Sequence, residues 1–209
     1  MTLEMTPAMQ KIFSYKAFIF DLDGTLINSM PFHVKAWIQV GAEHGFVVDP
    51  ALIYSMGGVS SRDVVTYFAS QGHDVGDIDE FVKRKVQLYR ENMDKVETIK
   101  PIEEVLKKGH ELGIKIAVGT GTQRINAVDI LKKLGLERYV DAIVCADDVK
   151  RHKPFPDTFL KCCSLMGVEP KDTLVFEDGK LGVQAAIDGG MHCVEVVDCK
   201  CDFAIKTSL

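Results

Sequence analysis

The sequence predicts an α/β fold: a parallel sheet whose strands alternate with helices, with a small helical domain inserted after the first strand. The strands are indicated by short, continuous apolar runs, which are typical of strands buried on both faces of a sheet. The insertion is indicated by the roughly ninety residues between the first run and the second, since a crossover helix needs only about a dozen. The runs are Ala17–Phe20, Ile114–Val118, Ala142–Ala146, Thr173–Phe176 and Cys193–Val197.

Helices are predicted between the later strands. Each helical segment stops at a glycine, which reaches the left-handed conformation of a helix end at little cost. Strands and helices that alternate at this spacing indicate parallel strands joined by crossovers. The segments are Pro101–Leu112 before Gly113, Thr122–Leu134 before Gly135, and Gly182–Ile187 before Gly189 and Gly190.

The insertion is predicted to be helical almost throughout and to form a cap domain. Asp49-Pro50 and Ser60-x-x-Asp63 have the residue types and spacing of helix starts. The predicted division is a core of residues 11–28 and 98–209, a cap of residues 29–97, chain crossings near Asn28–Pro31 and Thr98–Pro101, and an irregular extension at residues 1–10.

The composition excludes several classes of protein. With 209 residues, 46% of them hydrophobic, the chain can form a sizeable core and a smaller second domain. A net charge of −5 with scattered Lys and Arg argues against a nucleic-acid binder. No apolar run approaches the roughly 20 residues of a membrane span, and the N-terminus lacks the pattern of a signal peptide. We therefore expect a cytoplasmic protein, monomeric or weakly dimeric, whose six cysteines are reduced and bind no metal.

Two carboxylates follow the first predicted strand directly, in the segment Asp21-Leu-Asp23-Gly24-Thr25. Residues spaced i, i+2 at a strand end face the same way, so the two carboxylates would repel each other. A hard cation removes that difficulty, and Mg²⁺ prefers carboxylate oxygens, carbonyls, phosphate and water. Gly24 permits a tight turn away from the strand.

The three following strands end in residues suited to the same chemistry. Val118–Thr122 combines hydroxyls and glycines with the start of a helix, a combination that binds anions. Lys153-Pro154 after the third strand offers a positive charge for phosphate, and Glu177-Asp178 after the fourth offers carboxylates for a metal. Because open α/β sheets bind ligands at the carboxyl ends of their strands, we expect one phosphate and metal site at this edge.

Together these residues resemble the motif set of the haloacid dehalogenase superfamily of phosphotransferases, from about Ala17 to Val197. One subgroup carries a helical cap after the first strand and contains β-phosphoglucomutase and small sugar phosphatases. The segment Asn28–Trp37 is similar to the start of that cap, and Arg151–Phe159 with Val175–Asp178 is most similar to a fructose-1-phosphatase-like branch. The resemblance implies a Rossmann-like core, Mg²⁺ as cofactor and a small phosphate ester as substrate.

The resemblance also implies a role for each core residue. Asp21 is similar to the nucleophile that forms an aspartyl-phosphate and ligates Mg²⁺. Asp23 is similar to the general acid and base, with its backbone carbonyl on the metal. Thr120 and the Gly121 N–H would bind the phosphoryl oxygens, Lys153 would neutralise the phosphoryl group and Asp21, and Glu177 and Asp178 would hold Mg²⁺ directly or through water.

The cap is expected to face the core and to select the substrate. Its candidate contacts are His33, Trp37, Gly58, Ser60, Arg62, Lys83 and Lys85. For some of these a plainer interpretation stays open: Trp37 as part of the cap's core, and Lys83 and Lys85 as surface residues. Arg62 stands one residue away from the phosphate-binding arginine of the mutase.

Four functions remain open on the sequence. The first is a magnesium-dependent phosphatase acting on a sugar phosphate, and the second is β-phosphoglucomutase on the same core. Inorganic pyrophosphatase activity and a non-catalytic binding protein are lesser alternatives. A binding protein has no need for Asp21 and Asp23 together, and the halide-releasing members of the superfamily lack the pair Glu177-Asp178.

Overall fold

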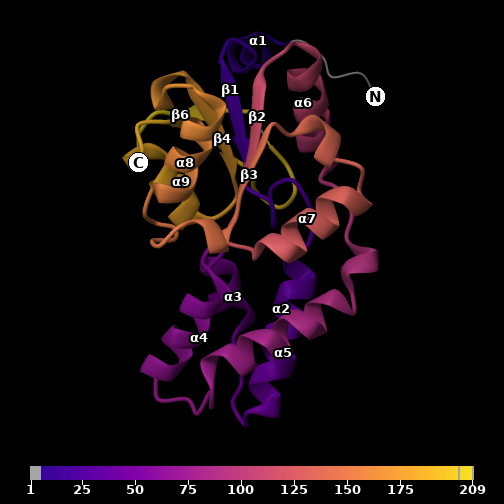
Figure 1. Cartoon of the computed structure of the whole chain (residues 1–209), viewed down its shortest axis with the longest axis vertical. Coiled ribbons are helices and arrows are strands. Elements are labelled where there is room, and N and C mark those ends of the chain that lie inside the picture. The colour runs from indigo at the N-terminus through magenta and orange to yellow at the C-terminus, as the bar shows by residue number, and fades with distance from the viewer. Residues whose placement is uncertain (1–5, 202, 209) are drawn as a thin grey trace.

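The computed structural model describes residues 6–201 and 203–208, and a six-stranded sheet lies at its centre (Figure 1). The strand order is β3-β2-β1-β4-β5-β6, and all neighbours are parallel except β5 and β6. The strands are β1 Ala17–Phe20, β2 Lys115–Gly119, β3 Ala142–Val144, β4 Thr173–Glu177, β5 His192–Glu195 and β6 Ile205–Lys206. The predicted α/β fold is confirmed, and each of the five predicted strands is present within two residues of its expected bounds.

The first strand lies in the middle of the sheet, between β2 and β4. Phe20 stands opposite Val118 on one side and Phe176 on the other, so the carboxyl ends of the three strands meet at one edge. The chain leaves β1 for β2 on one side and reaches β4 on the other. Such a reversal of strand order creates a crevice at the carboxyl edge, where open α/β sheets bind their ligands.

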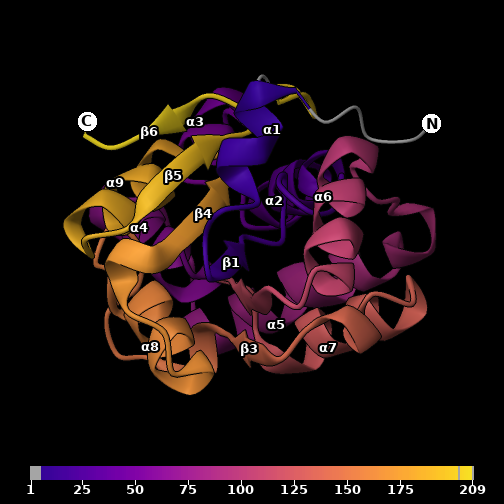
Figure 2. The same cartoon turned by 90° about the horizontal axis from the view of Figure 1, so that it is seen from above.

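Helices cover both faces of the sheet, as the view from above shows (Figure 2). Helices α6 and α7 pack on one face against Phe18 and Phe20, and α8 and α9 pack on the other face against Ile19. All four residues of β1 are buried because alternate side chains enter the two layers. The helices are α6 Lys100–Glu111, α7 Arg124–Lys133, α8 Asp157–Met166 and α9 Lys180–Asp188, and three short 3₁₀ turns, Glu137–Tyr139, Ala146–Asp148 and Pro170–Asp172, lie between elements.

The N-terminal segment differs from the sequence prediction. Helix α1, Pro7–Ile12, stands where an irregular extension was expected, and its N-cap is Thr6, whose hydroxyl accepts a hydrogen bond from the Met9 N–H at 3.3 Å. Only Met9 and Ile12 of this helix are buried. Two buried side chains are too few to give an apolar periodicity, so the pattern could not reveal the helix. Residues 1–5 of the expected extension lie outside the described residues.

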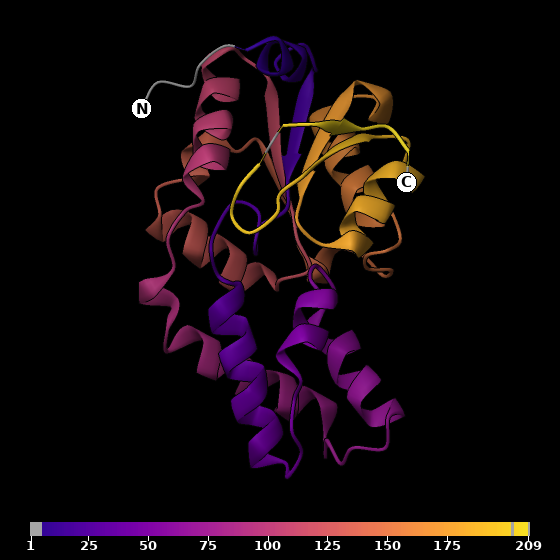
Figure 3. The same ribbon diagram turned by 180° about the vertical axis from the view of Figure 1, so that it is seen from behind.

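The insertion between β1 and β2 is helical in every element that the structure describes there. It lies beyond the carboxyl edge of the sheet (Figure 3). Both predicted helix starts are present: Asp49 caps α3 and Ser60 caps α4 through their side-chain oxygens. The elements are α2 Met30–Glu43, α3 Pro50–Ser55, α4 Ser61–Ser70, α5 Ile78–Arg90 and the 3₁₀ turn η1 Met93–Lys95.

The two chain crossings between insertion and sheet lie side by side. Ile27 and Thr98 form an antiparallel bridge, flanked by hydrogen bonds from Asn28 N to Glu97 O at 2.8 Å and from Ile99 N to Leu26 O at 2.9 Å. The helical insertion is therefore joined to the core by a paired, two-stranded connection.

Two features outside the fold itself were also predicted. No disulfide joins any of the six cysteines, all of which lie in the described part of the chain. Among the described residues, no helix is both long and apolar enough to cross a membrane.

Candidate active site

Asp21 follows β1, and its carboxylate is buried. Its backbone N–H donates to Phe176 O at 2.9 Å, which continues the β1–β4 pairing by one residue and fixes the side chain at the strand end. Lys153 Nζ lies 2.5 Å from Asp21 Oδ1 and 2.6 Å from Glu177 Oε1. The second oxygen of Asp21, Oδ2, is buried and has no hydrogen-bond partner among the described residues. One oxygen of Asp21 is thus held in place, and the other has no partner among the described residues.

The charges around Asp21 do not balance without a further cation. Burial raises the pKa of Asp21 well above its ordinary value, and the nearby carboxylates of Glu177 and Asp178 raise it further, while Lys153 opposes both effects. Burial alone would lower the pKa of Lys153, but Asp21 and Glu177 raise it, so this lysine is fully charged. One ammonium among three acidic groups leaves net negative charge in a buried site, which favours binding of a divalent cation.

Glu177 and Asp178, at the end of β4, are bound in different ways. Both oxygens of Glu177 have partners, Lys153 on one and the Gly179 N–H at 2.6 Å on the other. Asp178 Oδ1 accepts from Thr25 Oγ1 at 2.8 Å, and its carboxylate lies where a side chain on Gly24 would stand. Gly24 has a φ of +94°, so this position needs glycine for both conformation and space. Burial, and then repulsion from Glu177, raise the pKa of Asp178 to about 7.

The residues present fit a magnesium ion. Asp21 Oδ2 is unpartnered and Asp178 has a carboxylate oxygen beyond its bond to Thr25. In the described part of the chain, no three His, Cys, Asp or Glu side chains are arranged to hold a metal by themselves. Mg²⁺ does not require such a set, because it is commonly bound by one or two carboxylates together with water and substrate phosphate. The hard oxygen donors favour Mg²⁺ over a softer metal.

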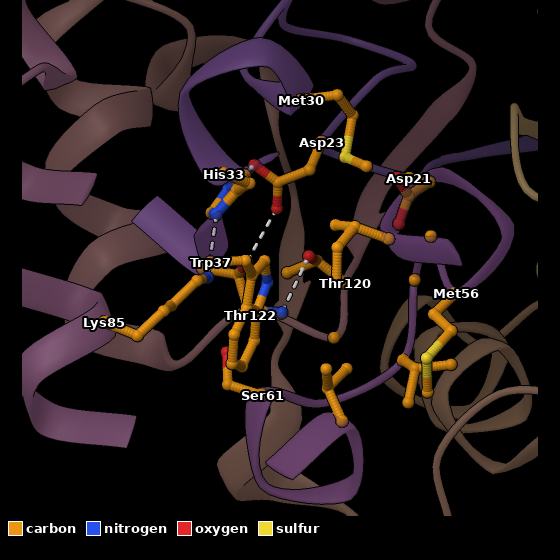
Figure 4. Close-up of a pocket in the computed structure, with 16 residues that line it drawn as sticks. Asp21, Asp23, Met30, His33, Trp37, Met56, Ser61, Lys85, Thr120 and Thr122 are labelled. Atoms are coloured by element: carbon orange, nitrogen blue, oxygen red, sulfur yellow. Dashed lines mark hydrogen bonds and ion pairs between the residues drawn. The ribbon is translucent and has the colours of Figure 1, made fainter. Parts of the chain in front are cut away.

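Asp23 is surrounded by hydrogen-bond donors (Figure 4). Oδ1 accepts from Ser29 Oγ at 2.6 Å and from His33 Nε2 at 2.9 Å, and Oδ2 accepts from Thr122 Oγ1 at 2.6 Å. Burial alone would raise the pKa of Asp23, but His33 and these hydrogen bonds lower it below the ordinary range. Asp23 is therefore an ionised carboxylate with fixed orientation, in contrast to Asp21.

His33 connects Asp23 to the cap lysine Lys85. Lys85 Nζ lies 2.9 Å from His33 Nδ1, and an ammonium group can only donate. His33 Nδ1 is therefore the acceptor, and Nε2 carries the proton that is donated to Asp23. Burial, and then repulsion from Lys85, lower the pKa of His33, so the ring is neutral. Burial lowers the pKa of Lys85 to about 8.

Thr120 and Gly121 follow β2 and lie against the cap. The Thr120 N–H donates to Val144 O, and the Thr120 hydroxyl accepts from the Thr122 N–H at 3.0 Å, which bends the loop over the sheet edge. A side chain on Gly121 would overlap the carbonyl of Gly58, a cap residue with a φ of +80°. The cap loop around Gly58 therefore packs directly on the backbone of the predicted phosphate-binding loop.

These residues enclose a cavity between the sheet edge and the helical insertion (Figure 4). The core contributes Asp21, Asp23, Thr120, Gly121 and Thr122, and the insertion contributes Met30, His33, Trp37, Ile53, Met56, Gly57, Gly58, Val59, Ser61, Val64 and Lys85. Four of the seven predicted cap contacts, His33, Trp37, Gly58 and Lys85, thus lie at the cavity. Trp37 also stacks on Phe81, so both interpretations of this residue hold.

The other three predicted cap contacts lie elsewhere. The Ser60 side chain caps α4 and bonds to Asp63. Arg62 pairs with Asp79 and Lys83 pairs with Glu80, and all four of these side chains are exposed. Arg62 and Lys83 are therefore corrected to surface residues. Sequence reasoning in turn missed Ser29 and Thr122 as partners of Asp23, although both stand inside quoted motifs, in the segment that begins at Asn28 and in Val118–Thr122.

The central strand of this fold ends in a buried aspartate, Asp21, beside Lys153, and a second aspartate, Asp23, is hydrogen-bonded by residues at the start of the helical cap. This combination defines the capped phosphohydrolases of α/β fold. The sequence profile of one family, haloacid dehalogenase-like hydrolase, matches residues 18–196, so the chain belongs to that family. It is an enzyme, a phosphohydrolase of this family.

Several characterised proteins are similar over most of their length. Fructose-1-phosphate phosphatase YqaB of Escherichia coli is 38% identical over 87% of this chain and 96% of its own. Validoxylamine A 7'-phosphate phosphatase of Streptomyces hygroscopicus is 34% identical over 86% of this chain and 84% of its own. Among solved structures, β-phosphoglucomutase of Clostridium difficile has a TM-score of 0.79 and 26% identity, covering 88% of this chain and 85% of its own.

Proposed function

We propose that this chain is a magnesium-dependent phosphatase that hydrolyses a sugar phosphate through an aspartyl-phosphate on Asp21. The observation that supports this best is the unpartnered Oδ2 of Asp21, a residue that lines the cavity and is fixed through Oδ1 by Lys153. A nucleophile needs one free oxygen and a positive charge for the incoming phosphoryl group, and this arrangement supplies both.

In the first step Asp21 Oδ2 attacks phosphorus, the bond from phosphorus to the ester oxygen breaks, and Asp23 gives a proton to that oxygen. Lys153 and Thr120 hold the phosphoryl oxygens. Asp21 and Asp178 would hold Mg²⁺, whose charge would offset the repulsion between the phosphate and these carboxylates. Asp23 must be protonated for this step, and the dianionic phosphate entering beside it favours that form.

In the second step a water molecule attacks the phosphorus of the aspartyl-phosphate and gives its proton to Asp23. Inorganic phosphate leaves and Asp21 is regenerated. The donors on Asp23 stabilise its ionised form, as a general base requires. The same residue therefore serves as acid and then as base, and His33 with Ser29 and Thr122 keeps it aimed at the cavity in both steps.

Two observations support a sugar monophosphate as substrate. The relative in Escherichia coli is named as a fructose-1-phosphate phosphatase, and the relative in Streptomyces hygroscopicus as a validoxylamine A 7'-phosphate phosphatase. Among the described residues that line the cavity, Lys85 is the one cation that the cap contributes, and it is already engaged with His33. A second phosphate group, as in the bisphosphate intermediate of a mutase, would find no free cap cation there. Arg62 and Lys83, the candidates for such a site, are paired at the surface.

We further propose that residues 29–97 act as a cap that opens for substrate. In the structure the cap loop around Gly58 lines the cavity and packs on Gly121, so separation of that contact would widen the entrance for a substrate. The paired crossing at Ile27 and Thr98 is the proposed hinge.

A phosphate-release screen tests the function. The enzyme with Mg²⁺ is offered fructose 1-phosphate, other sugar monophosphates and pyrophosphate, with Asp21→Asn as the inactive control. A parallel assay supplies β-glucose 1-phosphate with glucose 1,6-bisphosphate and follows glucose 6-phosphate. We expect release of phosphate from sugar monophosphates and little glucose 6-phosphate. Faster formation of glucose 6-phosphate than of free phosphate would establish the mutase instead, and no turnover in either assay would reject the catalytic proposal.

A further inference from the structure

We propose that Arg90 is a positioning residue for Asp23: it ties the cap helix α5 to the core helix α7 and so holds the general acid between its two groups of donors. This inference rests on the proposed phosphatase function, in which Asp23 protonates the leaving group. Arg90 belongs to no motif of the sequence analysis and does not line the cavity under Gly58.

The two oxygens of Asp23 are held by different parts of the molecule. Oδ1 is bonded to His33, whose ring also stacks on Tyr89 with ring centres 3.9 Å apart and is bonded to Lys85. Lys85 and Tyr89 both belong to α5, so this helix fixes the imidazole from two directions. Oδ2 is bonded to Thr122, in the loop that leads into the first turn of α7. The orientation of Asp23 therefore depends on the distance between α5 and α7.

Arg90 sets that distance. Its Nη1 donates to Asn126 Oδ1 at 2.6 Å and its Nη2 donates to Asp129 Oδ2 at 2.8 Å, so the planar guanidinium bridges two side chains on one face of α7. Asn126 is 3% exposed and stands in the first turn of α7, three residues after Gln123, which ends the loop. A two-pronged bond to a buried amide and a carboxylate fixes direction as well as distance, which a single ion pair does not.

The contacts form a closed ring: Asp23 to His33, His33 to α5, Arg90 to Asn126, and α7 through its loop to Thr122 and back to Asp23. A second, small cavity lies within this ring, and its lining includes His33, Lys85 and Tyr89 from the cap and Thr122 and Asn126 from the core. Because this space is not filled by side chains, packing alone does not keep the two helices at their spacing. The bond from Arg90 performs that task at the outer side of the cavity.

A second link between the same regions offers a matched control. Lys133 of α7 pairs with Asp94 of η1, and the Asp94 side chain is 93% exposed. This pair joins cap and core as Arg90 does, but it bonds to no buried group and lies at the C-terminal end of α7, away from Asn126 and Thr122. Surface pairs of this kind contribute little to stability or position.

The test uses the leaving-group dependence of kcat/KM, which reports the steps up to formation of the aspartyl-phosphate. A sugar phosphate needs a proton on its leaving oxygen, whereas p-nitrophenyl phosphate releases a stable anion and does not. We expect Arg90→Met to lower kcat/KM about tenfold for the best sugar phosphate and less than about twofold for p-nitrophenyl phosphate, the size expected for loss of one positioning contact. Arg90→Lys should fall between wild type and Arg90→Met, and Lys133→Met should match wild type on both substrates.

Further variants keep the inference falsifiable if Arg90→Met does not fold. Asn126→Asp keeps the acceptor and should retain the wild-type ratio between the two substrates, whereas Asn126→Leu removes it and should lower the ratio as Arg90→Met does. Equal losses on both substrates, or no loss on either in a folded variant, would overturn the positioning role. A wild-type enzyme that releases no phosphate from any ester would instead reject the proposed function.

Discussion

Replacement of Lys153 by methionine gives the most direct test of the charge arrangement at the site. The ammonium of Lys153 lies between Asp21 and Glu177, and all three side chains are 1% exposed. Removal of one partner from a buried ion pair typically costs about 3–5 kcal/mol, because the remaining charge is left without compensation. For a chain of this size each kcal/mol shifts the unfolding temperature by about 2–4 °C, so we expect metal-free Lys153→Met to unfold about 6–20 °C below wild type.

Both pH and Mg²⁺ should change the difference in unfolding temperature between Lys153→Met and wild type. Burial already raises the folded-state pKa of Asp21 above its unfolded value, and loss of the lysine removes the charge that opposes this rise. A carboxylate with a raised folded-state pKa destabilises the fold as pH rises through that pKa, so the difference in unfolding temperature should shrink as pH is lowered. Mg²⁺ supplies positive charge beside Asp21 and should raise the unfolding temperature of the variant more than that of wild type.

Thermal unfolding followed by circular dichroism, with chelator or with excess Mg²⁺, measures these effects. Lys108→Met is the control, since Lys108 pairs with Glu111 on the exposed side of α6 and its loss should change stability by less than about 0.5 kcal/mol. Turnover by Lys153→Met should fall by about 10²–10³, the usual cost of one lost group that stabilises charge in the transition state. A metal-free Lys153→Met that unfolds at or above the wild-type temperature would refute the charge argument.

Three further predictions follow from the same site. Asp21→Asn should release no phosphate while unfolding near the wild-type temperature, and near-normal turnover by the pure variant would reject Asp21 as nucleophile. Because burial raises the pKa of Asp178 to about 7, the metal-free protein should lose stability as pH rises from about 4 to 7. Mg²⁺ should bind more tightly as pH rises through the same window, and its binding should release a proton. Calorimetric titration in two buffers detects the proton, and an affinity for Mg²⁺ that does not change with pH would contradict the assignment. The side chains of Asp63 in the cap and His152 in the core approach to 3.9 Å. In the double variant Asp63→Cys/His152→Cys, oxidation to a disulfide should stop turnover and reduction should restore it, because the linked cap cannot open. An unchanged rate in the oxidised variant would argue against cap opening.

The sheet could be predicted because its strands are buried on both faces, which leaves a continuous apolar run in the sequence. Strand β6, only two residues long with Lys206 exposed, leaves no such run and was missed. The short α1 was missed for the same reason, since only two of its side chains are buried. Where few side chains enter the core, the apolar pattern is too short to be recognised.

The gathering of the core residues at one edge could be predicted because most of them stand at the end of a strand, where the parallel sheet brings them together. Lys153 stands nine residues after the end of β3 and still reaches Asp21. The catalytic roles of these residues stay predictions. The cap could not be predicted to the same degree. Lys83 and Lys85 stand in one basic triplet, yet Lys83 is exposed and Lys85 is buried at the cavity. Two positions on a helix point about 200° apart, so their roles depend on which face of α5 meets the core. That choice is made by tertiary packing and leaves no local signal in the sequence.

The two aspartates of the motif are two residues apart and yet have opposite surroundings. Asp21 is held by core residues alone, whereas Asp23 takes two of its three donors, Ser29 and His33, from the segment that begins the cap. On the proposed mechanism the nucleophile is therefore in place whether or not the cap is closed, while the acid and base is complete only in the closed form. An open enzyme would bind a phosphate ester beside Asp21 but could not protonate its leaving group efficiently. The arrangement thus couples closure of the cap over a fitting substrate to the chemical step, and it explains why the residues that hold Asp23 come from both sides of the cavity.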